Sequence, residues 1–366
     1  MIAVTEPRVA RILVIKWSAL GDMAMATAVF EDIARAYPQA TIHLNTLPNL
    51  AGLFEHDPRF AEVWAFDMRA RGKRLSQSLA WLRRARAGAY DMVIDLQRSD
   101  HTRMLLALWV ATGGAPRIRA GNRGGFPYNR QPAIRRSGAH ALATMRSVLE
   151  SLGIPAQTDV PVFHPAPGRR EAVMALMQTH SLEAGRYAVL IPGAAAAHPL
   201  KRWGAGRYRE LAQRLHDSGG WKLVLIGGPD EVSLCREIAG AHDYVVDLNG
   251  KLQLLDIPLL CAGARAVIGN DTGAAHFAAA SGQPVVVLCG PTDPRRVKPI
   301  GPQVVALQAR LDCINCYART CANPVHQACM QAIEPAWLAA RLLSGEPPAR
   351  WGEASTPVQV FDPDVS

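Results

Sequence analysis

The chain has 366 residues, enough for two domains of ordinary size, and 49% of them are hydrophobic and 19% charged, which is typical of a globular protein. Its net charge of +9 favours anionic partners. A short, polar N-terminus and the lack of any run of about 18 apolar residues argue against a signal peptide and a spanning helix, so we expect a soluble, cytoplasmic protein.

The N-terminal half alternates apolar strand patterns with a helical one. The sequence predicts strands at 11–17, 40–47 and 90–97, and a helix at 24–38 that proline ends. In "KWSALGDMAMATAVF" (16–30) a single glycine is expected to turn the chain from strand to helix, with Asp22 directly after it. Such alternation indicates a parallel, doubly wound sheet.

The same pattern restarts in the C-terminal half, after a Pro- and Gly-rich stretch at 153–168. We therefore expect α/β domains at 1–165 and 166–345 with a cleft between them, and a tail at 346–366 that returns to the first domain or is disordered. Ligands of open α/β sheets bind at the carboxyl ends of the strands, so the loops there are the candidate sites.

The stretch 267–294, "VIGNDTGAAHFAAASGQPVVVLCGPTDP", joins a predicted strand to a helix through a polar loop. The small residues Thr272 and Gly273 leave backbone N–H groups free for an anion at the helix start. Asp271 either caps the helix or accepts hydrogen bonds from sugar hydroxyls. His276 either donates to a phosphate or satisfies a buried partner.

Two further loops follow predicted strands. In 191–211, Gly193 begins a small-residue loop, and Lys201 and Arg202 could neutralise a departing diphosphate. In 225–231, "LIGGPDE", Asp230 or Glu231 could bind ribose hydroxyls, as strand-end acids do in dinucleotide folds. Neither G-x-G-x-x-G nor G-x-x-x-x-G-K-[ST] occurs in these loops, so neither a standard dinucleotide site nor a P-loop is supported.

Four segments together resemble glycosyltransferase family 9, the lipopolysaccharide heptosyltransferases: "ILVIKWSALGDMAMATAVF", "PLKRWGAGRYRELA", "IGGPDE" and "GNDTGAAHFAAASGQPVVVLCGPTDP". The resemblance covers roughly residues 10–335. It implies the GT-B fold, two Rossmann-like domains facing across a cleft. It also implies inverting transfer of heptose from ADP-L-glycero-D-manno-heptose to the inner core (Kdo or heptose), with no cofactor needed for catalysis. Many members have proline soon after D-T-G, where this chain has "DTGAAHF".

The resemblance also implies roles for residues at matching positions. Asp22 would be the general base, and Lys201 would contact the donor phosphates. Asp271, Thr272 and Gly273 would bind the donor sugar and diphosphate. Either Asp230 or, as the reserve, Glu231 would bind the ribose.

The resemblance further implies that the N-terminal domain binds the acceptor and the C-terminal domain binds the nucleotide sugar. Positive charge is concentrated in the N-terminal half. Residues 1–160 hold 21 Lys and Arg against 13 Asp and Glu, whereas residues 161–366 hold 19 against 18. The basic segment 68–90 is interleaved with Leu and Trp, which also suits a membrane surface, so we expect peripheral association with the inner face of the cytoplasmic membrane. The candidates to hold an anionic lipopolysaccharide acceptor are Arg69, Arg71, Lys73, Arg74, Arg119, Arg123 and Arg130.

Four of the seven cysteines form a C-x2-C-x4-C-x7-C cluster, namely Cys313, Cys316, Cys321 and Cys329. In a cytoplasmic protein this favours a metal over disulfides, and four thiolates would close a structural zinc site. The spacing matches no standard zinc finger, however, so we expect free or partly paired thiols, with structural zinc and an iron–sulfur cluster as the alternatives. The remaining cysteines, Cys235, Cys261 and Cys289, lie in apolar segments and are expected in the core.

Other functions remain open at this stage. A GT-B enzyme could use another nucleotide sugar, or could be an epimerase that acts on the donor alone. A catalytically silent nucleotide-sugar-binding protein is a third possibility, and the presence of Asp22 and Lys201 argues against it. Nucleic acid is not expected as a partner, because the basic region carries no recognisable reading motif.

Overall fold

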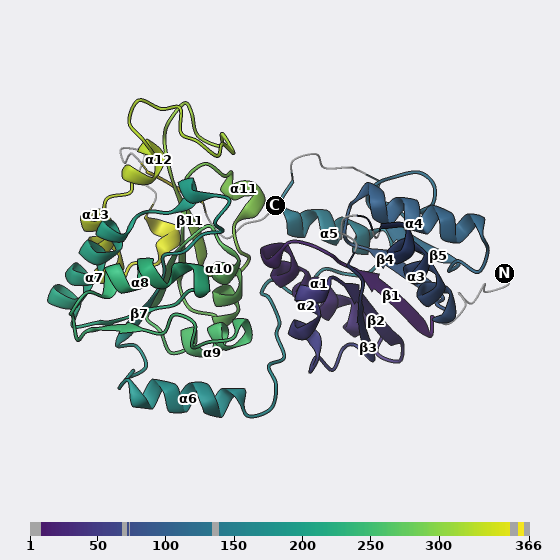
Figure 1. The fold of residues 1–366 in the computed structure, drawn as a ribbon, viewed down its shortest axis with the longest axis horizontal. Coiled ribbons are helices and arrows are strands. Elements are labelled where there is room, and N and C mark those ends of the chain that lie inside the picture. Colours follow the sequence, from purple (N-terminus) through teal and green to yellow (C-terminus); the bar gives the residue numbers. More distant parts are fainter. Residues whose placement is uncertain (1–8, 68–71, 73, 134–138, 352–357, 362–366) are drawn as a thin grey trace. The chain divides into compact units, whose positions relative to one another are not determined.

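The computed structural model describes residues 9–67, 72, 74–133, 139–351 and 358–361. The chain divides into two compact units, Met1–Thr158 and Asp159–Ser366 (Figure 1). Each unit is an α/β domain built on a sheet of parallel strands, as the alternation of patterns predicts, and the second sheet adds one antiparallel edge strand.

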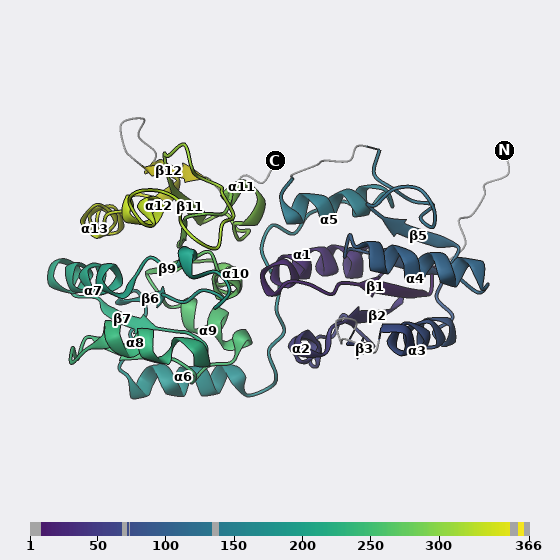
Figure 2. The same ribbon diagram turned by 45° about the horizontal axis from the view of Figure 1, so that its top comes forward.

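The first unit contains a five-stranded parallel sheet with the order β3-β2-β1-β4-β5. Its strands are β1 (Arg11–Ile15), β2 (Thr41–Thr46), β3 (Glu62–Ala65), β4 (Met92–Asp95) and β5 (Ile118–Gly121). Its helices are α1 (Leu20–Ala36), α2 (Pro48–Ala51), α3 (Arg74–Ala87), α4 (Asp100–Ala111) and α5 (Ala141–Glu150). Helix α1 packs with α5, and α3 packs with α4 (Figure 2). The strand order reverses between β1 and β4, which makes their carboxyl ends the switch point of this sheet.

The second unit contains a seven-stranded sheet with the order β12-β11-β10-β9-β6-β7-β8. Its strands are β6 (Tyr187–Ile191), β7 (Lys222–Leu225), β8 (Val245–Asp247), β9 (Ala266–Asn270), β10 (Val285–Cys289), β11 (Val304–Ala309) and β12 (Val358–Phe361). Its helices are α6 (Arg169–Thr179), α7 (Ala205–Gly219), α8 (Val232–Ala239), α9 (Ile257–Cys261), α10 (Gly273–Ala278), α11 (Pro294–Val297), α12 (Ala328–Gln331) and α13 (Pro335–Leu343). Strands β6 and β9 are adjacent at the switch point of this sheet.

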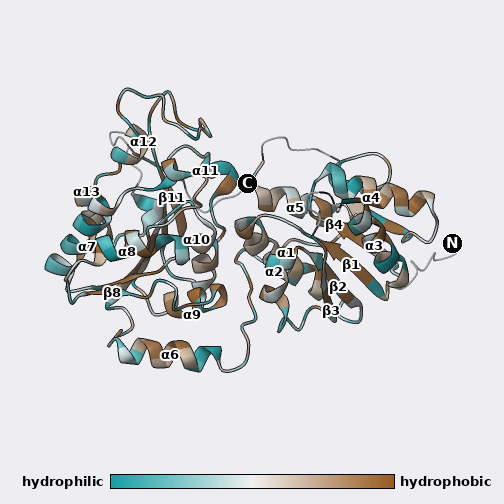
Figure 3. Ribbon diagram, viewed as in Figure 1, coloured by the Kyte–Doolittle hydropathy of each residue, from teal (hydrophilic) through white to brown (hydrophobic). Residues whose placement is uncertain are grey.

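Apolar strands form the centre of each unit (Figure 3). Every residue of β4, β6, β9 and β10 is buried. Continuous apolar runs of this kind are what a parallel sheet covered on both faces requires. The burial explains why the central strands are predicted well from sequence.

The boundary between the units lies earlier than the predicted division after residue 165. Thr158 belongs to the first unit, where its hydroxyl donates to the Asp32 carboxylate at 2.6 Å. Phe163 belongs to the second unit, because its ring stacks on Phe277 with the ring centres 4.5 Å apart. The Pro-rich stretch therefore does not act as a free linker throughout, since part of it packs on the second unit.

The described part of the tail differs from the expected return to the first domain. Strand β12 pairs antiparallel with β11 at the edge of the second sheet, with Gln359 opposite Gln308. Trp351 is buried, and its indole N–H donates to the carbonyl of Glu346 at 3.0 Å. An open sheet edge and an apolar pocket for the tryptophan account for this placement.

Candidate functional site

The loop after β1 places one acid beside a buried lysine. Helix α1 begins at Leu20, so Gly21 lies within the helix instead of forming the predicted turn, and Asp22 lies in the first helical turn. Lys16 directly follows β1 and is buried, and its Nζ lies 3.8 Å from Oδ2 of Asp22. The Asp22 side chain is 40% exposed, so its carboxylate is accessible to solvent while its countercharge is not.

A second carboxyl group lies at the end of the neighbouring strand. Asp95 ends β4, is opposite Ile15 in the sheet and is buried. It accepts a hydrogen bond from the Tyr128 hydroxyl at 2.5 Å and another from the Gln97 backbone N–H at 2.9 Å. Burial raises the pKa of Asp95, and burial lowers the pKa of Lys16 although both acids oppose that shift. Lys16 is thus a buried cation between two carboxyl groups.

Side-chain hydrogen bonds hold this loop in place. The Asn45 carbonyl oxygen accepts both indole N–H groups of Trp17 and Trp81, at 2.8 and 2.7 Å. Gln97 accepts from the Trp17 backbone N–H at 2.7 Å and donates to the Ser18 hydroxyl at 2.8 Å. Asn45 and Gln97 were not predicted as site residues, because a lone amide at a strand end carries no sequence signal.

At the carboxyl end of β9, Asn270 connects three segments of the second unit. Its carbonyl oxygen accepts from the Trp203 backbone N–H at 3.2 Å and from the Tyr208 hydroxyl at 3.1 Å. Its amide donates to the carbonyls of Pro192 and Gly193 at 2.7 and 3.1 Å. Buried Asn270 thereby sets the spacing of the loops that follow β6 and β9. It too was missed from the sequence.

Lys201 and Asp271, predicted as separate donor contacts, form one ion pair. Lys201 Nζ lies 2.6 Å from Asp271 Oδ2, and the Thr292 hydroxyl donates to the same oxygen at 2.7 Å. Asp271 is buried, whereas the Lys201 side chain is 19% exposed. The carboxylate therefore orients the lysine, and Thr292 is an additional residue of the "GPTDP" motif that the sequence analysis did not single out.

The other residues predicted at the carboxyl ends of these strands lie in and around the short helix α10 and the loop after β6. Thr272 precedes α10 without a side-chain capping hydrogen bond, and α10 has only six residues. Gly273 begins that helix, and His276 is buried within it. Arg202 donates to the carbonyl of Ala194 at 3.1 Å, which ties the K-R-W segment to the loop after β6.

Of the two acids after β7, Glu231 lies closer to the other loops. Its carboxylate accepts from the Gly228 backbone N–H. A β-carbon on Gly193 would lie 2.0 Å from Glu231 Oε1, so the Glu231 carboxylate lies against the loop after β6. Asp230 is exposed. The geometry therefore favours Glu231 over Asp230 as the acid at the carboxyl ends of these strands.

The candidate acceptor residues fall into three groups. Arg69, Arg71 and Lys73 lie outside the described residues. Arg119 donates to the carbonyls of Pro127 and Pro116, both at 2.7 Å, so its guanidinium is engaged by the backbone. The remaining arginines are at or near the surface: Arg74 begins α3, Arg123 pairs with Asp100 at 2.6 Å, and Arg130 donates to its neighbour's carbonyl.

The cysteines separate as expected into core and cluster. Cys235, Cys261 and Cys289 are fully buried. The four clustered cysteines line a cavity of about 310 Å³. Among the described residues, no three His, Cys, Asp or Glu side chains are grouped closely enough to hold a metal ion.

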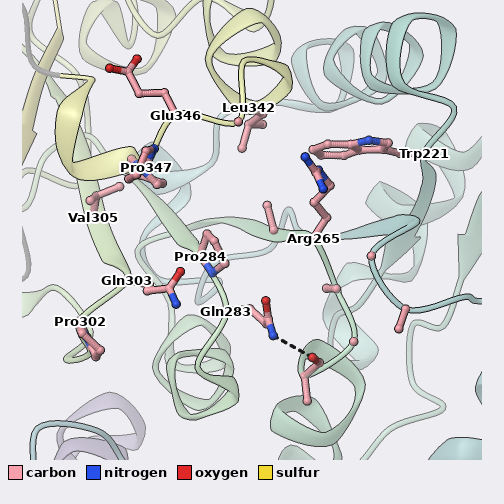
Figure 4. Close-up of a pocket in the computed structure, with 18 of the residues that line it drawn as sticks. Trp221, Arg265, Gln283, Pro284, Pro302, Gln303, Val305, Leu342, Glu346 and Pro347 are labelled. Carbon is pink, nitrogen blue, oxygen red and sulfur yellow. Dashed lines mark hydrogen bonds between the residues drawn. The ribbon is translucent and has the colours of Figure 1, made fainter.

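A larger cavity of about 810 Å³ lies at the amino ends of the strands of the second sheet (Figure 4). Its lining includes Arg265 and Pro284, which immediately precede β9 and β10. The Arg265 guanidinium lies over the Trp221 ring, 5.5 Å from its centre. Because ligands of parallel sheets bind at the carboxyl ends of the strands, we do not assign the donor site to this cavity.

Comparison with known proteins identifies a matching family model and several relatives that the chain covers over most of their length. Residues 78–326 match the family model described as Glycosyltransferase family 9 (heptosyltransferase). The chain is 27% identical to lipopolysaccharide heptosyltransferase 1 of Pseudomonas aeruginosa, over 85% of this chain and 87% of the relative. It is 26% identical to lipopolysaccharide heptosyltransferase 2 of Escherichia coli K12, over 79% of this chain and 85% of the relative.

Solved structures show the same fold. A family 9 glycosyl transferase from Veillonella parvula has a TM-score of 0.70 at 24% identity, over 82% of this chain and 86% of that one. Escherichia coli heptosyltransferase WaaC with ADP has a TM-score of 0.67 at 22% identity, over 92% of this chain and all of the other. The likeness to the heptosyltransferase structures shows the GT-B fold, which agrees with two domains built on parallel strands.

Proposed function

This chain belongs to glycosyltransferase family 9, and from that premise we propose that it transfers heptose from ADP-L-glycero-D-manno-heptose to an anionic inner-core acceptor of lipopolysaccharide. The relatives of similar length are lipopolysaccharide heptosyltransferases, and one structural neighbour is bound to ADP. The observation that carries the proposal is the Lys201–Asp271–Thr292 arrangement, a fixed cation at the strand ends where a sugar diphosphate would bind.

In the proposed reaction the acceptor hydroxyl oxygen attacks the anomeric carbon as the bond to the ADP oxygen breaks. Asp22 takes the hydroxyl proton, which requires an accessible carboxylate in its ionised form. Its 40% exposure provides the access, and the buried Lys16 Nζ lies 3.8 Å from Asp22 Oδ2 as its countercharge. A single displacement of this kind inverts the anomeric centre and needs no metal.

Lys201 stabilises the negative charge that develops on the departing ADP. A pre-oriented cation is effective here because it needs no reorganisation during the reaction. Asp271 and Thr292 supply that orientation through their 2.6 and 2.7 Å contacts, and the exposed part of Lys201 leaves room for phosphate oxygens. The loops containing Gly193, Thr272, Gly273 and His276 would surround the donor.

Glu231 is our choice for the ribose hydroxyls. Of the two candidate acids, it is the one whose carboxylate lies over Gly193. For the acceptor we propose Arg74, Arg123 and Arg130, which can offer guanidinium donors to carboxylate or phosphate groups. We also propose that the protein attaches peripherally to the inner face of the cytoplasmic membrane, where a lipid-anchored acceptor would be found.

The test of this function is an Asp22→Asn variant. We expect acceptor-dependent ADP release to fall by at least about 100-fold, which is the contribution typical of a general base. ADP binding, measured by calorimetry, should remain within about twofold of wild type, because Asp22 lies in the other unit from Lys201.

The matched control is Asp217→Asn, which changes an exposed carboxylate on α7 in the same way. It should leave both ADP release and ADP binding unchanged. Wild-type turnover in Asp22→Asn would remove Asp22 as the base. Binding of the ADP-sugar without transfer by the wild-type protein would favour a catalytically silent protein instead.

A further inference from the structure

The loop that follows β5 is closed at its base and braced within. Residues 122–131, here called the arginine loop, carry Arg123 and Arg130, two of the proposed acceptor ligands. The Gly121 backbone N–H donates to the Arg130 carbonyl at 3.2 Å and closes the base of the loop. Inside the loop, the Gln131 side chain accepts one backbone N–H at 2.7 Å and donates to a backbone carbonyl at 2.9 Å. The two arginines are therefore presented by a segment that its own hydrogen bonds hold in shape.

Tyr128 attaches the arginine loop to the carboxyl end of β4. It is 5% exposed, and its hydroxyl donates to Asp95 Oδ2 at 2.5 Å. A β-carbon on Gly121 would lie 2.4 Å from the ring atom Cε1, so the ring lies against the end of β5. Gly121 and Asp95 are paired in the sheet. The tyrosine thus joins the loop to the ends of two neighbouring strands, and a hydrogen bond to a carboxylate is among the stronger ones in proteins.

The same carboxyl group faces the lysine beside the proposed base. Asp95 is paired with Ile15, the residue before Lys16, and both charged side chains are buried. Burial lowers the pKa of Lys16, and the Asp22 and Asp95 charges oppose that shift. Burial raises the pKa of Asp95, and the hydrogen bond from Tyr128 opposes that shift. Because Lys16 Nζ lies 3.8 Å from Asp22 Oδ2, a continuous series of contacts runs from the arginine loop to the base.

We propose that Tyr128 and Asp95 anchor the arginine loop beside Asp22, so that an anionic saccharide held by the loop presents its hydroxyl to this base. The inference rests on the proposed function and adds to it the part of the chain that positions the acceptor. Tyr128 and Asp95 are positioning residues, because both are buried and act through other groups. A loop that is ordered before its ligand arrives binds more tightly, since the ligand does not have to order it.

The two residues contribute in different ways. Tyr128 supplies position, whereas Asp95 supplies both an attachment point and a charge. In the part of the chain that the structure describes, Asp22 on α1 and Asp95 on β4 are the charged groups that act on Lys16. Lys16 and Tyr128 are the titratable neighbours of Asp95, and Arg103 of α4 acts on Tyr128. Position and charge can therefore be removed separately, by Tyr128→Phe and by Asp95→Asn.

The first test is Tyr128→Phe, which removes the hydroxyl and keeps the ring. We expect the KM for the acceptor to rise roughly tenfold, the usual effect of losing one hydrogen bond to a charged group. The kcat should change much less, because the bound acceptor itself orders the loop. The matched control is Tyr90→Phe, since Tyr90 is 6% exposed and its hydroxyl lies 2.8 Å from His43 Nδ1. Tyr90 precedes β4, at the other end of that strand from Asp95, so this change should leave the acceptor KM unaltered.

The second test is Asp95→Asn, which keeps an oxygen that can accept from Tyr128 and removes the charge. We expect the acceptor KM to stay close to that of wild type. The fall of kcat/KM at alkaline pH should move to lower pH, because Lys16 then has one acid fewer to keep it protonated. Tyr128→Phe should keep the wild-type alkaline fall, because the Asp95 carboxylate remains. An unmoved profile in Asp95→Asn would contradict the role of its charge.

Hydrogen exchange of the protein alone separates this proposal from the proposed function. The backbone N–H groups of residues 122–131 should exchange faster in Tyr128→Phe than in wild type or Tyr90→Phe, and circular dichroism should show all three variants folded. Unchanged exchange in the arginine loop would overturn the proposal, as would an acceptor KM that rises equally in Tyr90→Phe. If wild-type protein transfers sugar to no core acceptor, the proposed function fails, and the exchange rates still decide whether Tyr128 anchors the loop.

Discussion

At the scale of single residues, the least expected feature is the buried Lys16 between Asp22 and Asp95. Its distance of 3.8 Å from Asp22 and its burial make it the fixed countercharge of the proposed base. Lys16 does not touch the substrate in this account. It acts as a positioning residue, which holds the Asp22 carboxylate in place.

This arrangement predicts a pH dependence. Because burial lowers the pKa of Lys16, the lysine loses its proton at a lower pH than an ordinary lysine, and the neutral amine no longer offsets the two acids. We expect kcat/KM to fall on the alkaline side below the ordinary lysine pKa of about 10.4. Lys16→Arg, which stays charged, should move this fall to higher pH.

The measurement is the profile of kcat/KM from roughly pH 6 to 10 for both proteins. Circular dichroism at each pH checks that the larger guanidinium is accommodated. If wild type and Lys16→Arg lose activity at the same alkaline pH, Lys16 is not the group that titrates.

The sequence indicated several candidate site residues, but it did not indicate which side chains they pair with. Lys201 and Asp271 are 70 positions apart, so their ion pair depends on which strand ends the fold brings together. Asn45 and Asn270 do much of the local positioning, yet a single asparagine has no distinguishing pattern. Arg119 is the opposite case: the sequence predicts it as an acceptor ligand, but its guanidinium donates to backbone carbonyls instead.

At the scale of elements, the loops after β6 and β7 approach each other at Gly193, where a β-carbon would lie 2.0 Å from Glu231 Oε1. Glu231 fills that space, which is why we assign it to the donor ribose. We expect Glu231→Gln to weaken ADP binding by roughly tenfold, the cost of about one charged hydrogen bond of 1.5 kcal/mol. Asp230→Asn, on the neighbouring exposed acid, should have little effect.

Isothermal titration of ADP against both variants distinguishes the two acids. A larger loss in Asp230→Asn than in Glu231→Gln would restore Asp230 as the ribose ligand. An equal, small loss in both would leave the ribose without an acidic partner on this loop.

The central strands were predicted well because buried parallel strands are continuous apolar runs, as in β9 and β10. Strands β3, β5, β8, β11 and β12 were not predicted. The linker and the tail were predicted less well. Their composition is Pro-rich and polar, but their few large side chains, such as Phe163 and Trp351, find apolar partners in the second unit. Whether such a residue has a partner depends on the tertiary structure, which local composition does not encode.

At the scale of the whole molecule, positive charge and exposed apolar side chains occur together on the first unit. On α3, Leu75 and Leu79 are 76% and 47% exposed, and α4, which packs beside it, exposes Met104 and Leu108. None of the helices within the described ranges has the length and apolarity needed to cross a bilayer. The exposed apolar side chains of α3 and α4, which lie one helical turn apart on each helix, are therefore our candidates for attachment to a membrane surface.

This predicts binding to vesicles that contain an anionic lipid. Wild-type protein should sediment with phosphatidylglycerol-containing vesicles and much less with phosphatidylcholine alone, and added salt should weaken the binding. Leu75→Ser/Leu79→Ser should reduce sedimentation, whereas Met174→Ser, on exposed α6 of the second unit, should not. Sedimentation that is independent of lipid charge and of both leucines would contradict this placement.

The central claim is that the protein moves a heptose from an ADP-activated donor to an inner-core acceptor. It is tested most directly by incubating the protein with ADP-heptose and a panel of truncated core acceptors, and by measuring ADP release and acceptor mass together. We predict ADP release only when a suitable anionic acceptor is present, with a gain of one heptose on that acceptor. Donor conversion without acceptor, or no product from any core acceptor although the donor binds, would contradict the account.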